Sequence, residues 1–185
     1  EEQHKLFDVI IEEVNRLNGV VNKFLDYARP YNLMLKPQNI NKLVSRTVSI
    51  IAANELAGKI SIVQELAENL PDVEIDEQQF MPVILNIAIN AIEAMQPGGT
   101  LTLRTSRIET AAGIAVGITI RDTGHGISKE SLKNIFKPFY TTKERGAGLG
   151  LAICQRIIKD HGGIIRVKSI PGQGSVFFIR LAAAS

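Results

Sequence analysis

The stretch GAGLGLAICQRIIKDHGG, residues 146–163, places Gly146, Gly148 and Gly150 at alternate positions directly before a helix-forming sequence. Glycine costs a helix about 1 kcal/mol relative to alanine, so helix stability does not explain the repeat. A helix N-terminus presents unpaired N–H groups and a positive dipole end, and glycines keep side chains away from an approaching anion. The pattern fits a phosphate-binding loop, and it also fits a flexible loop before a surface helix.

The composition of the 185-residue chain indicates a globular protein that does not bind nucleic acid. Lys and Arg total 21 against 19 Asp and Glu, a net charge of +2 that is too balanced for such binding. The single cysteine, Cys154, excludes an intrachain disulfide and favours a buried thiol in a reducing compartment. No apolar run approaches the roughly 20 residues of a membrane span. We expect a cytoplasmic portion of a longer protein, whose membrane anchoring stays open.

Residues 4–28 have the pattern of one long amphipathic helix that Pro30 ends. So broad an apolar stripe needs a partner helix, supplied by another part of the protein or by a second copy, unless it packs on its own domain. Glu13 interrupts the heptad-like seam. The seam and its flanks consist of Leu6, Ile10, Leu17, Val20, Phe24 and Tyr27, with Phe7, Val14, Val21 and Ala28.

Beyond a linker predicted over 31–37, helical and strand patterns are mixed. Asp76 followed by Gln79 resembles a capping box. Hairpin-linked, mostly antiparallel strands predict an α+β fold, a two-layer sandwich with helices on one face of a mixed sheet. Helices are expected over 40–57, from Asp76 to Met95, over 128–135 and from Gly150 to the HGG at 161–163, and strands over 59–66, 100–106, 114–121, 164–169 and 175–181.

Two short motifs carry candidate ligand-binding residues. In ILNIAINAIEAM, residues 84–95, Asn86, Asn90 and Glu93 share one helix stripe. Amide oxygens suit Mg²⁺, which completes its shell with water and phosphates; a solvent-facing stripe is the alternative. In DTGHG, Asp122 follows an apolar strand and could accept a hydrogen bond from an adenine amine. A tight turn is the plain alternative, and DTG is also the aspartic-protease tripeptide, although that fold is nearly all-β.

The segment IFKPFYTTKERGAGLGLAI, residues 135–153, has the pattern of a lid. We expect Phe136 and Phe139 to anchor it at one end, and the glycine-led helix to close it at the other. Lys143 and Arg145 could reach phosphates from this loop, although loop cations are often only solvated. We expect His125, between two glycines, to be an exposed turn residue, and His161 to be structural.

These motifs together resemble the catalytic, ATP-binding domain of bacterial two-component sensor histidine kinases of the GHKL superfamily. The resemblance covers about 38–183 and rests on four motifs in the family's order: the asparagine box, DTGHG, FKPFYTTK and GAGLGLA. It implies the Bergerat fold for 38–185, the linker at 31–37, and in 1–30 part of the dimerisation and histidine-phosphotransfer hairpin, whose second helix residues 10–30 resemble.

The resemblance also implies a role for each site residue. It makes Asn86, Asn90 and Lys143 catalytic, with Asn90 as the Mg²⁺ ligand. Glu93 stands where many members place a basic residue, so no phosphate contact is assigned to it. The residues expected to bind ATP are Asn86, Asn90, Asp122, Gly124, Gly126, Phe136, Phe139, Lys143, Gly146, Gly148, Leu149 and Gly150.

Three functions compete: a kinase that phosphorylates histidine, a GHKL ATPase that drives conformational change, and a nucleotide-binding or dimerisation module without catalysis. The ATPases place a glutamate one turn before the magnesium asparagine to activate water. Here that position is Asn86, which cannot act as a general base, and the prediction is therefore a kinase. The implied partners are a response-regulator receiver domain and a second copy of the chain. Neither His4 nor His161 has the flanking sequence of the phosphoacceptor, so we expect the acceptor histidine to lie upstream of Glu1, on the first helix of the hairpin.

Overall fold

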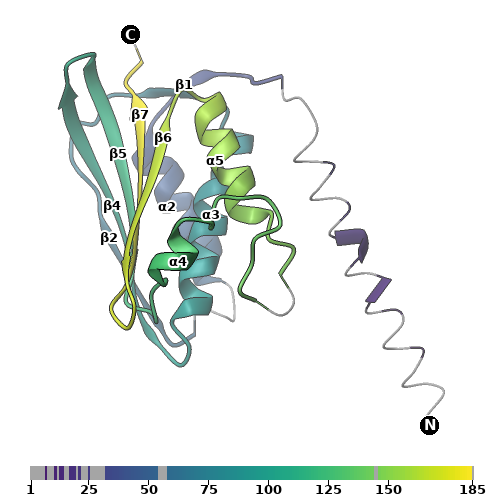
Figure 1. The fold of residues 1–185 in the computed structure, drawn as a ribbon. Helices are drawn as coiled ribbons and strands as arrows, with labels where there is room; N and C mark the ends of the chain where they lie inside the picture. The colour runs from purple at the N-terminus through teal and green to yellow at the C-terminus, as the bar shows by residue number, and fades with distance from the viewer. Residues whose placement is uncertain are drawn as a thin grey trace.

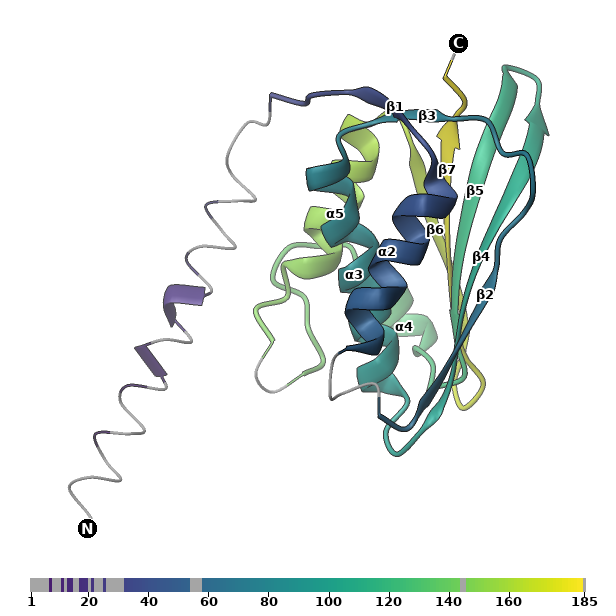
Figure 2. The ribbon, with the colours of Figure 1, turned by 180° about the vertical axis from the view of Figure 1, so that it is seen from behind.

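The computed structural model describes residues 32–53, 58–143 and 146–184, together with nine residues from Phe7 to Leu25. Three helices cover one face of a five-stranded sheet, so the domain has two layers (Figure 1 and Figure 2). The helices are α2 (Ile40–Ala52), α3 (Glu77–Ala94) and α5 (Gly150–Asp160). The sheet contains, in spatial order, β2 (Ile60–Glu65), β4 (Gly99–Thr110), β5 (Gly113–Asp122), β7 (Gly174–Ala182) and β6 (Ile164–Ile170).

The pairing of the strands confirms the predicted α+β sandwich with a mixed, mostly antiparallel sheet. Strand β2 runs parallel to β4, whereas β4 with β5, β5 with β7 and β6 with β7 are antiparallel. The predicted elements are present with shifted ends. Strand β4 continues to Thr110, α2 ends at Ala52 with residues 54–57 outside the described part, and the helix expected over 128–135 is the single turn α4 (Lys129–Leu132).

Helix α3 lies at the centre of the core. Its apolar stripe of Phe80, Ile84, Ile87 and Ala91 is buried, as the spacing predicts. Cys154 of α5 is also buried, and burial raises the pKa of its thiol to about 12. The thiol is therefore neutral at pH 7 and fills space in the core, as expected.

A second, two-stranded sheet differs from the sequence expectation. Strand β1 (Lys36–Gln38) pairs antiparallel with β3 (Val73–Ile75), so Lys36 and Pro37 belong to a strand, although the sequence places them in the linker. Two strands of three residues and a proline give too little period-2 pattern to be recognised. The division into domains otherwise remains a prediction.

The start of α3 is capped by a contact that the sequence does not reveal. Asp76 is the N-cap, and its side chain accepts from the N–H groups of Gln78 and Gln79. The predicted capping box is only half correct. Its second half requires the Gln79 side chain to accept from the Asp76 N–H, but that N–H donates to His161 Nε2 at 3.1 Å. His161 is buried, meets the ring of Phe80 edge-on and also contacts the Ile157 carbonyl through Nδ1. It is therefore a structural residue, as predicted.

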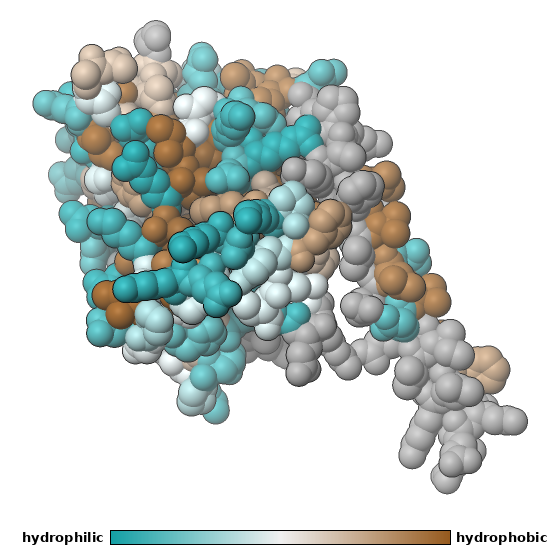
Figure 3. Space-filling view, viewed as in Figure 1, coloured by the Kyte–Doolittle hydropathy of each residue, from teal (hydrophilic) through white to brown (hydrophobic). Residues whose placement is uncertain are grey.

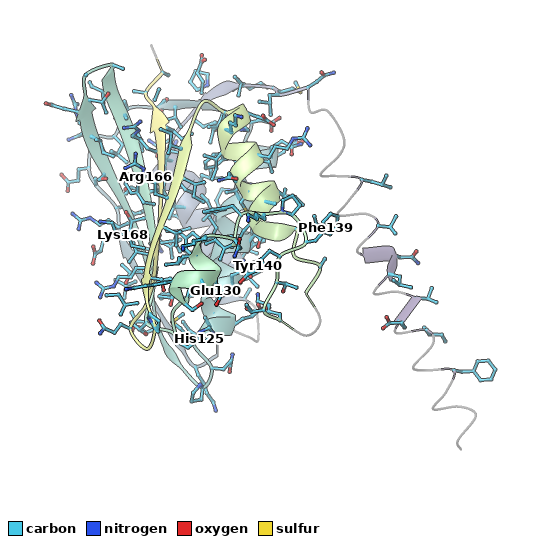
Figure 4. All side chains as sticks on the ribbon, in the orientation of Figure 1. His125, Glu130, Phe139, Tyr140, Arg166 and Lys168 are labelled. Atoms are coloured by element: carbon cyan, nitrogen blue, oxygen red, sulfur yellow. The ribbon has the colours of Figure 1, made fainter. Side chains whose placement is uncertain are left out.

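The remaining surface is mostly polar. Figure 3 shows hydrophilic side chains over much of one face, with small apolar patches between them. Arg166 and Lys168 project from β6 away from the helices (Figure 4). The predicted helix over 4–28 lies largely outside the described residues; the nine that are described there are helical and exposed. Among the described residues, no helix combines the length and the hydrophobicity that crossing a membrane requires.

Candidate functional site

One edge of α3 carries the polar residues that the sequence singles out. Asn86, Asn90 and Ala94 are spaced by four residues and therefore lie above one another on the helix. The Nδ2 group of Asn90 donates to Asn86 Oδ1 at 3.0 Å, and both side chains are half-buried. Of the predicted stripe, Glu93 is exposed, whereas Asn86 and Asn90 are half-buried and contact other side chains, so a purely solvent-facing stripe does not describe the two asparagines.

Asn86 contacts the start of α5, where the glycine repeat lies. A Cβ on Gly150 would be 2.7 Å from Asn86 Nδ2, and one on Gly146 would be 2.6 Å from Thr141 Oγ1. Gly148 has φ +67, and its Cβ would be 2.4 Å from the carbonyl carbon of Phe139. Contact with backbone at a positive φ therefore requires glycine at position 148, before any ligand is considered, whereas a Cβ at 146 or 150 would press on the ends of the Thr141 and Asn86 side chains.

The first turn of α5 keeps its backbone donors available. Leu149, the N-cap, is fully buried and makes no side-chain capping hydrogen bond. The first N–H groups of a helix have no partner within the helix and carry its positive dipole end. This arrangement supports the phosphate-binding role of Gly146, Gly148, Leu149 and Gly150, which remains a prediction.

Ala94 contacts the turn that follows β5. A Cβ on Gly124 would be 2.5 Å from the Ala94 carbonyl oxygen, and the His125 N–H donates to that oxygen at 3.1 Å. Gly126 has φ +71, and its Cβ would be 2.3 Å from the Ile170 carbonyl oxygen. Both glycines fix the turn against its neighbours, and His125 is exposed at its tip, as expected (Figure 4).

Asp122, at the end of β5, is a buried carboxylate in a hydrogen-bonded frame. Its exposed fraction is 3%, and its Oδ1 accepts from the N–H groups of Gly124 at 2.9 Å and Ser175 at 3.1 Å. Burial raises the pKa of Asp122 above its ordinary value of 3.8, and these two hydrogen bonds oppose the rise. With Oδ1 engaged twice, the second oxygen is the one suited to accept from a ligand.

Ser175 is a member of this site that the sequence analysis missed. It is the second residue of β7, its N–H donates to Asp122 Oδ1, and its hydroxyl lies 3.0 Å from that of Ser169 on β6. Gly174 has φ +90, and a Cβ there would be 2.1 Å from the Asp122 carbonyl oxygen. The PGQG turn between the last two strands, at residues 171–174, was the available signal, but the pairing of β5 with β7 is not visible in the sequence.

The lid is anchored differently from the expectation. Phe136 is half-buried against the core, as predicted. The prediction that Phe139 is an apolar anchor is wrong, because this residue is 59% exposed (Figure 4). Its φ of +65 is rare for a residue with a side chain and marks local strain. Tyr140 takes the anchoring place, since it packs against the core and its hydroxyl donates to Ser131 Oγ at 2.9 Å.

Lys143 closes the site over α3. Its Nζ donates to Asn90 Oδ1 at 2.5 Å and forms an ion pair with Glu93. Lys143 therefore comes from the lid to the middle of the asparagine edge, while Arg145 lies outside the described residues. Asn86, Asn90 and Ala94 thus join α5, the lid and the Asp122 turn in one site.

The donor set suits a magnesium ion that is shared with a ligand. The described residues contain no cluster of three His, Cys, Asp or Glu side chains that could hold a metal ion. The Asn90 oxygen already faces a cation, the Lys143 ammonium, with the Glu93 carboxylate beside it. A single amide oxygen fits Mg²⁺ when phosphates and water supply the other ligands.

Helices on one face of a mixed sheet, with a glycine-led helix start beside an asparagine edge, are typical of one class of nucleotide-binding domains. Comparison with known proteins supports the assignment to this class. The sequence model of the histidine kinase-, DNA gyrase B- and HSP90-like ATPase family matches residues 75–185. The chain belongs to this family.

Curated relatives place the similarity among sensor histidine kinases. The chain is 38% identical to the sensor histidine kinase ZraS of Salmonella typhi over 180 residues. It is 37% identical to sporulation kinase C of Bacillus subtilis (strain 168), again over 180 residues. These alignments cover 97% of this chain but only 38% and 41% of the relatives.

Solved structures share the fold. Full-length ShkA in complex with AMPPNP matches all of this chain and 40% of its own, with a TM-score of 0.82 and 29% identity. Histidine kinase ThkA in complex with the response regulator protein TrrA matches 97% of this chain and 51% of its own, with a TM-score of 0.79 and 28% identity.

Proposed function

We propose that the chain is the catalytic part of a sensor histidine kinase and transfers the γ-phosphate of ATP to a histidine. The observation that carries this proposal is the edge of α3, where Asn86, Asn90 and Ala94 join the α5 N-terminus, the lid lysine and the Asp122 turn. In the reaction, a histidine ring nitrogen attacks the γ-phosphorus and the bond to the β-phosphate oxygen breaks, so that ADP leaves.

The buried carboxylate would bind the adenine. Asp122 offers its second oxygen to the adenine amine, while Gly124 and Gly126 keep the turn close to the base. The hydrogen bonds to Oδ1 hold the carboxylate in place before the ligand arrives. Such a fixed anionic acceptor favours adenine over guanine, which has a carbonyl oxygen at that position.

The phosphates would lie between α3 and α5. The N–H groups at the α5 start would bind phosphate oxygens, and Lys143 would face the transferred phosphate. Asn90 Oδ1 would hold Mg²⁺, with Asn86 fixing the Asn90 amide. When bound, Mg²⁺ would supply charge neutralisation of the phosphates.

The ATPase alternative lacks its water-activating group. The position one turn before Asn90 carries the amide of Asn86, which has no basic site to take a proton from water. The similarity to curated kinases also supports transfer to a histidine.

The partners follow from the same similarity. A second copy would cover the N-terminal helix, where Phe7, Ile11, Val14, Leu17, Val21 and Leu25 are each at least half exposed. A receiver domain would take the phosphate onward, as suggested by the complex of ThkA with a response regulator.

The test is transfer in trans. The chain is incubated with γ-labelled ATP and Mg²⁺, with and without a separate helical hairpin from a sensor kinase that carries its acceptor histidine. We expect label on the hairpin that acid removes, because phosphohistidine is acid-labile, and we expect slow transfer because the acceptor is not tethered. Steady release of free phosphate without a hairpin would instead support the ATPase function.

A further inference from the structure

Lys143 of the lid is hydrogen-bonded to Asn90 Oδ1, the oxygen that binds the metal in the proposed function. Lys143 Nζ lies 2.5 Å from Asn90 Oδ1 and is paired with the Glu93 carboxylate, although the three residues come from two segments about 50 positions apart. Glu93 lies three residues after Asn90 on α3, so both face the lid together. A positive charge therefore already lies beside the oxygen that is proposed to bind the metal.

The orientation of Asn90 leaves that oxygen as the point of contact. Its Nδ2 group donates to Asn86 Oδ1 at 3.0 Å, which turns Oδ1 toward the lid. Magnesium binds oxygen at about 2.0–2.1 Å. An ion at that distance and an ammonium hydrogen-bonded to the same oxygen would lie within a few ångströms of each other, where two cations repel.

We propose that Glu93 is a positioning residue that holds Lys143 on Asn90 in the nucleotide-free protein, so that Mg²⁺ must displace the lysine from Asn90 to bind. This inference rests on the proposed function, in which Asn90 is the metal ligand. The exchange is feasible because the Lys143 and Glu93 side chains are 49% and 43% exposed, and half-exposed ion pairs are weak. A displaced Lys143 becomes available for the terminal phosphate.

A metal titration tests the competition. The affinity for ADP is measured by calorimetry at increasing Mg²⁺, starting from EDTA, which gives the Mg²⁺ midpoint at which ADP binding tightens. ADP has no γ-phosphate, so it separates the metal from the expected phosphate contact of Lys143. We expect Lys143→Met to lower the midpoint about two- to fivefold, because the competing cation is gone.

Glu93→Gln should shift the Mg²⁺ midpoint in opposite directions for the two possible roles of Glu93. If Glu93 holds the lysine on Asn90, the variant releases the lysine and lowers the midpoint. If Glu93 only attracts the metal, its loss raises the midpoint, which would contradict the proposal. The controls are Glu130→Gln and Lys137→Met, exposed charges of the same type outside this contact, and they should leave the midpoint unchanged.

A second readout needs no nucleotide. Hydrogen exchange of the peptide that covers residues 139–150 should be several-fold faster in Lys143→Met and in Glu93→Gln than in the unaltered chain. The double variant should exchange no faster than either single variant, because both substitutions remove the same contact. Unchanged exchange in both single variants would overturn the proposal.

Asn90→Ala separates the two levels of inference. If ADP binding to the unaltered chain does not depend on Mg²⁺, the metal assignment and everything built on it are wrong. If the dependence exists and Asn90→Ala removes it, while Lys143→Met leaves the midpoint unchanged, only the competition between lysine and metal is wrong.

Discussion

The two ends of the site are built in different ways. At the Asp122 end, a carboxylate that is 3% exposed accepts two backbone N–H groups, and Gly126 and Gly174 hold positive φ values in contact with neighbouring backbone. At the Asn90 end, the contacts are made by side chains that are nearly half exposed, Lys143 and Glu93. The first end forms when the domain folds, whereas the second is held by contacts that a ligand can replace.

This difference separates recognition from chemistry. In the proposed function, Asp122 would be a preformed acceptor for the base, which requires no rearrangement upon binding and can therefore select the ligand. In the proposed function, exchangeable contacts at the phosphate end would allow the lid and the metal to take new positions during the reaction. Substitutions at the two ends should therefore affect different quantities.

The largest effect is expected at Asn90. We expect Asn90→Ala to reduce phosphotransfer about 100-fold or more, because the Mg²⁺ ligand is lost, while the fold is retained. Transfer to a supplied hairpin measures activity, and circular dichroism measures the fold. Gln78→Ala, an exposed position on the same helix, is the control. Full transfer by Asn90→Ala with Mg²⁺ would refute the metal role.

Asp122→Asn should affect binding of the base. The variant loses an anionic acceptor worth about 1.5–3 kcal/mol, so calorimetry should find ADP affinity reduced about 10- to 100-fold. The asparagine oxygen can still accept from Gly124 and Ser175. An unchanged affinity would show that the adenine does not bind at Asp122.

The same substitution should not destabilise the domain. Because the folded-state pKa of Asp122 is raised, folding stability from this group is present below 3.8 and is lost as pH rises through the raised pKa. Asp122→Asn removes this loss, so its urea midpoint at pH 7 should equal or exceed that of the unaltered chain. A lower midpoint would mean that the charge stabilises the fold.

A smaller effect is expected from the glycines, which offer a matched pair. Gly148 and Gly162 both have φ +67, but a Cβ on Gly162 has nothing within 4 Å, whereas one on Gly148 would clash with Phe139. We expect Gly162→Ala to cost about 1 kcal/mol and Gly148→Ala about 2 kcal/mol by urea unfolding. Only Gly148→Ala should also weaken ADP binding. Equal costs would mean that the lid yields without strain.

The smallest effect on phosphotransfer is expected at His161, far from either end. His161→Ala leaves the Asp76 N–H without its acceptor and leaves a cavity beside Phe80, so it should cost about 2–4 kcal/mol of unfolding free energy, with transfer per folded molecule unchanged. The exposed His125→Ala is the control and should stay within about 0.5 kcal/mol. A selective loss of transfer in His161→Ala would show that this contact reaches the active end.

The features that depend on neighbours in the chain could be predicted from the sequence. The Asn86–Asn90 spacing, the Asp122 turn and the helix after Gly150 are local patterns, and the apolar stripe of α3 was readable from its period. The sequence located the glycines correctly. The contacts that explain them, with Asn86, Phe139 and Ala94, become visible only in the folded structure.

The features that were missed join distant segments. His161 contacts Asp76 across 85 positions, and Ser175 contacts Asp122 across 53. Neither contact leaves a periodic pattern or a spacing rule in the sequence. The place of Phe139 was mistaken because an aromatic residue predicts burial, whereas here the backbone turns and leaves Tyr140 to pack.

The most direct test is a crystal structure of the chain with Mg²⁺ and a non-hydrolysable ATP analogue. We predict the adenine amine at the second oxygen of Asp122, the metal at Asn90 Oδ1 and Lys143 displaced from Asn90 toward the terminal phosphate. The Asp122 frame should be unchanged, because it is preformed. A metal bound elsewhere with Lys143 still on Asn90, or a base bound away from Asp122, would contradict the account.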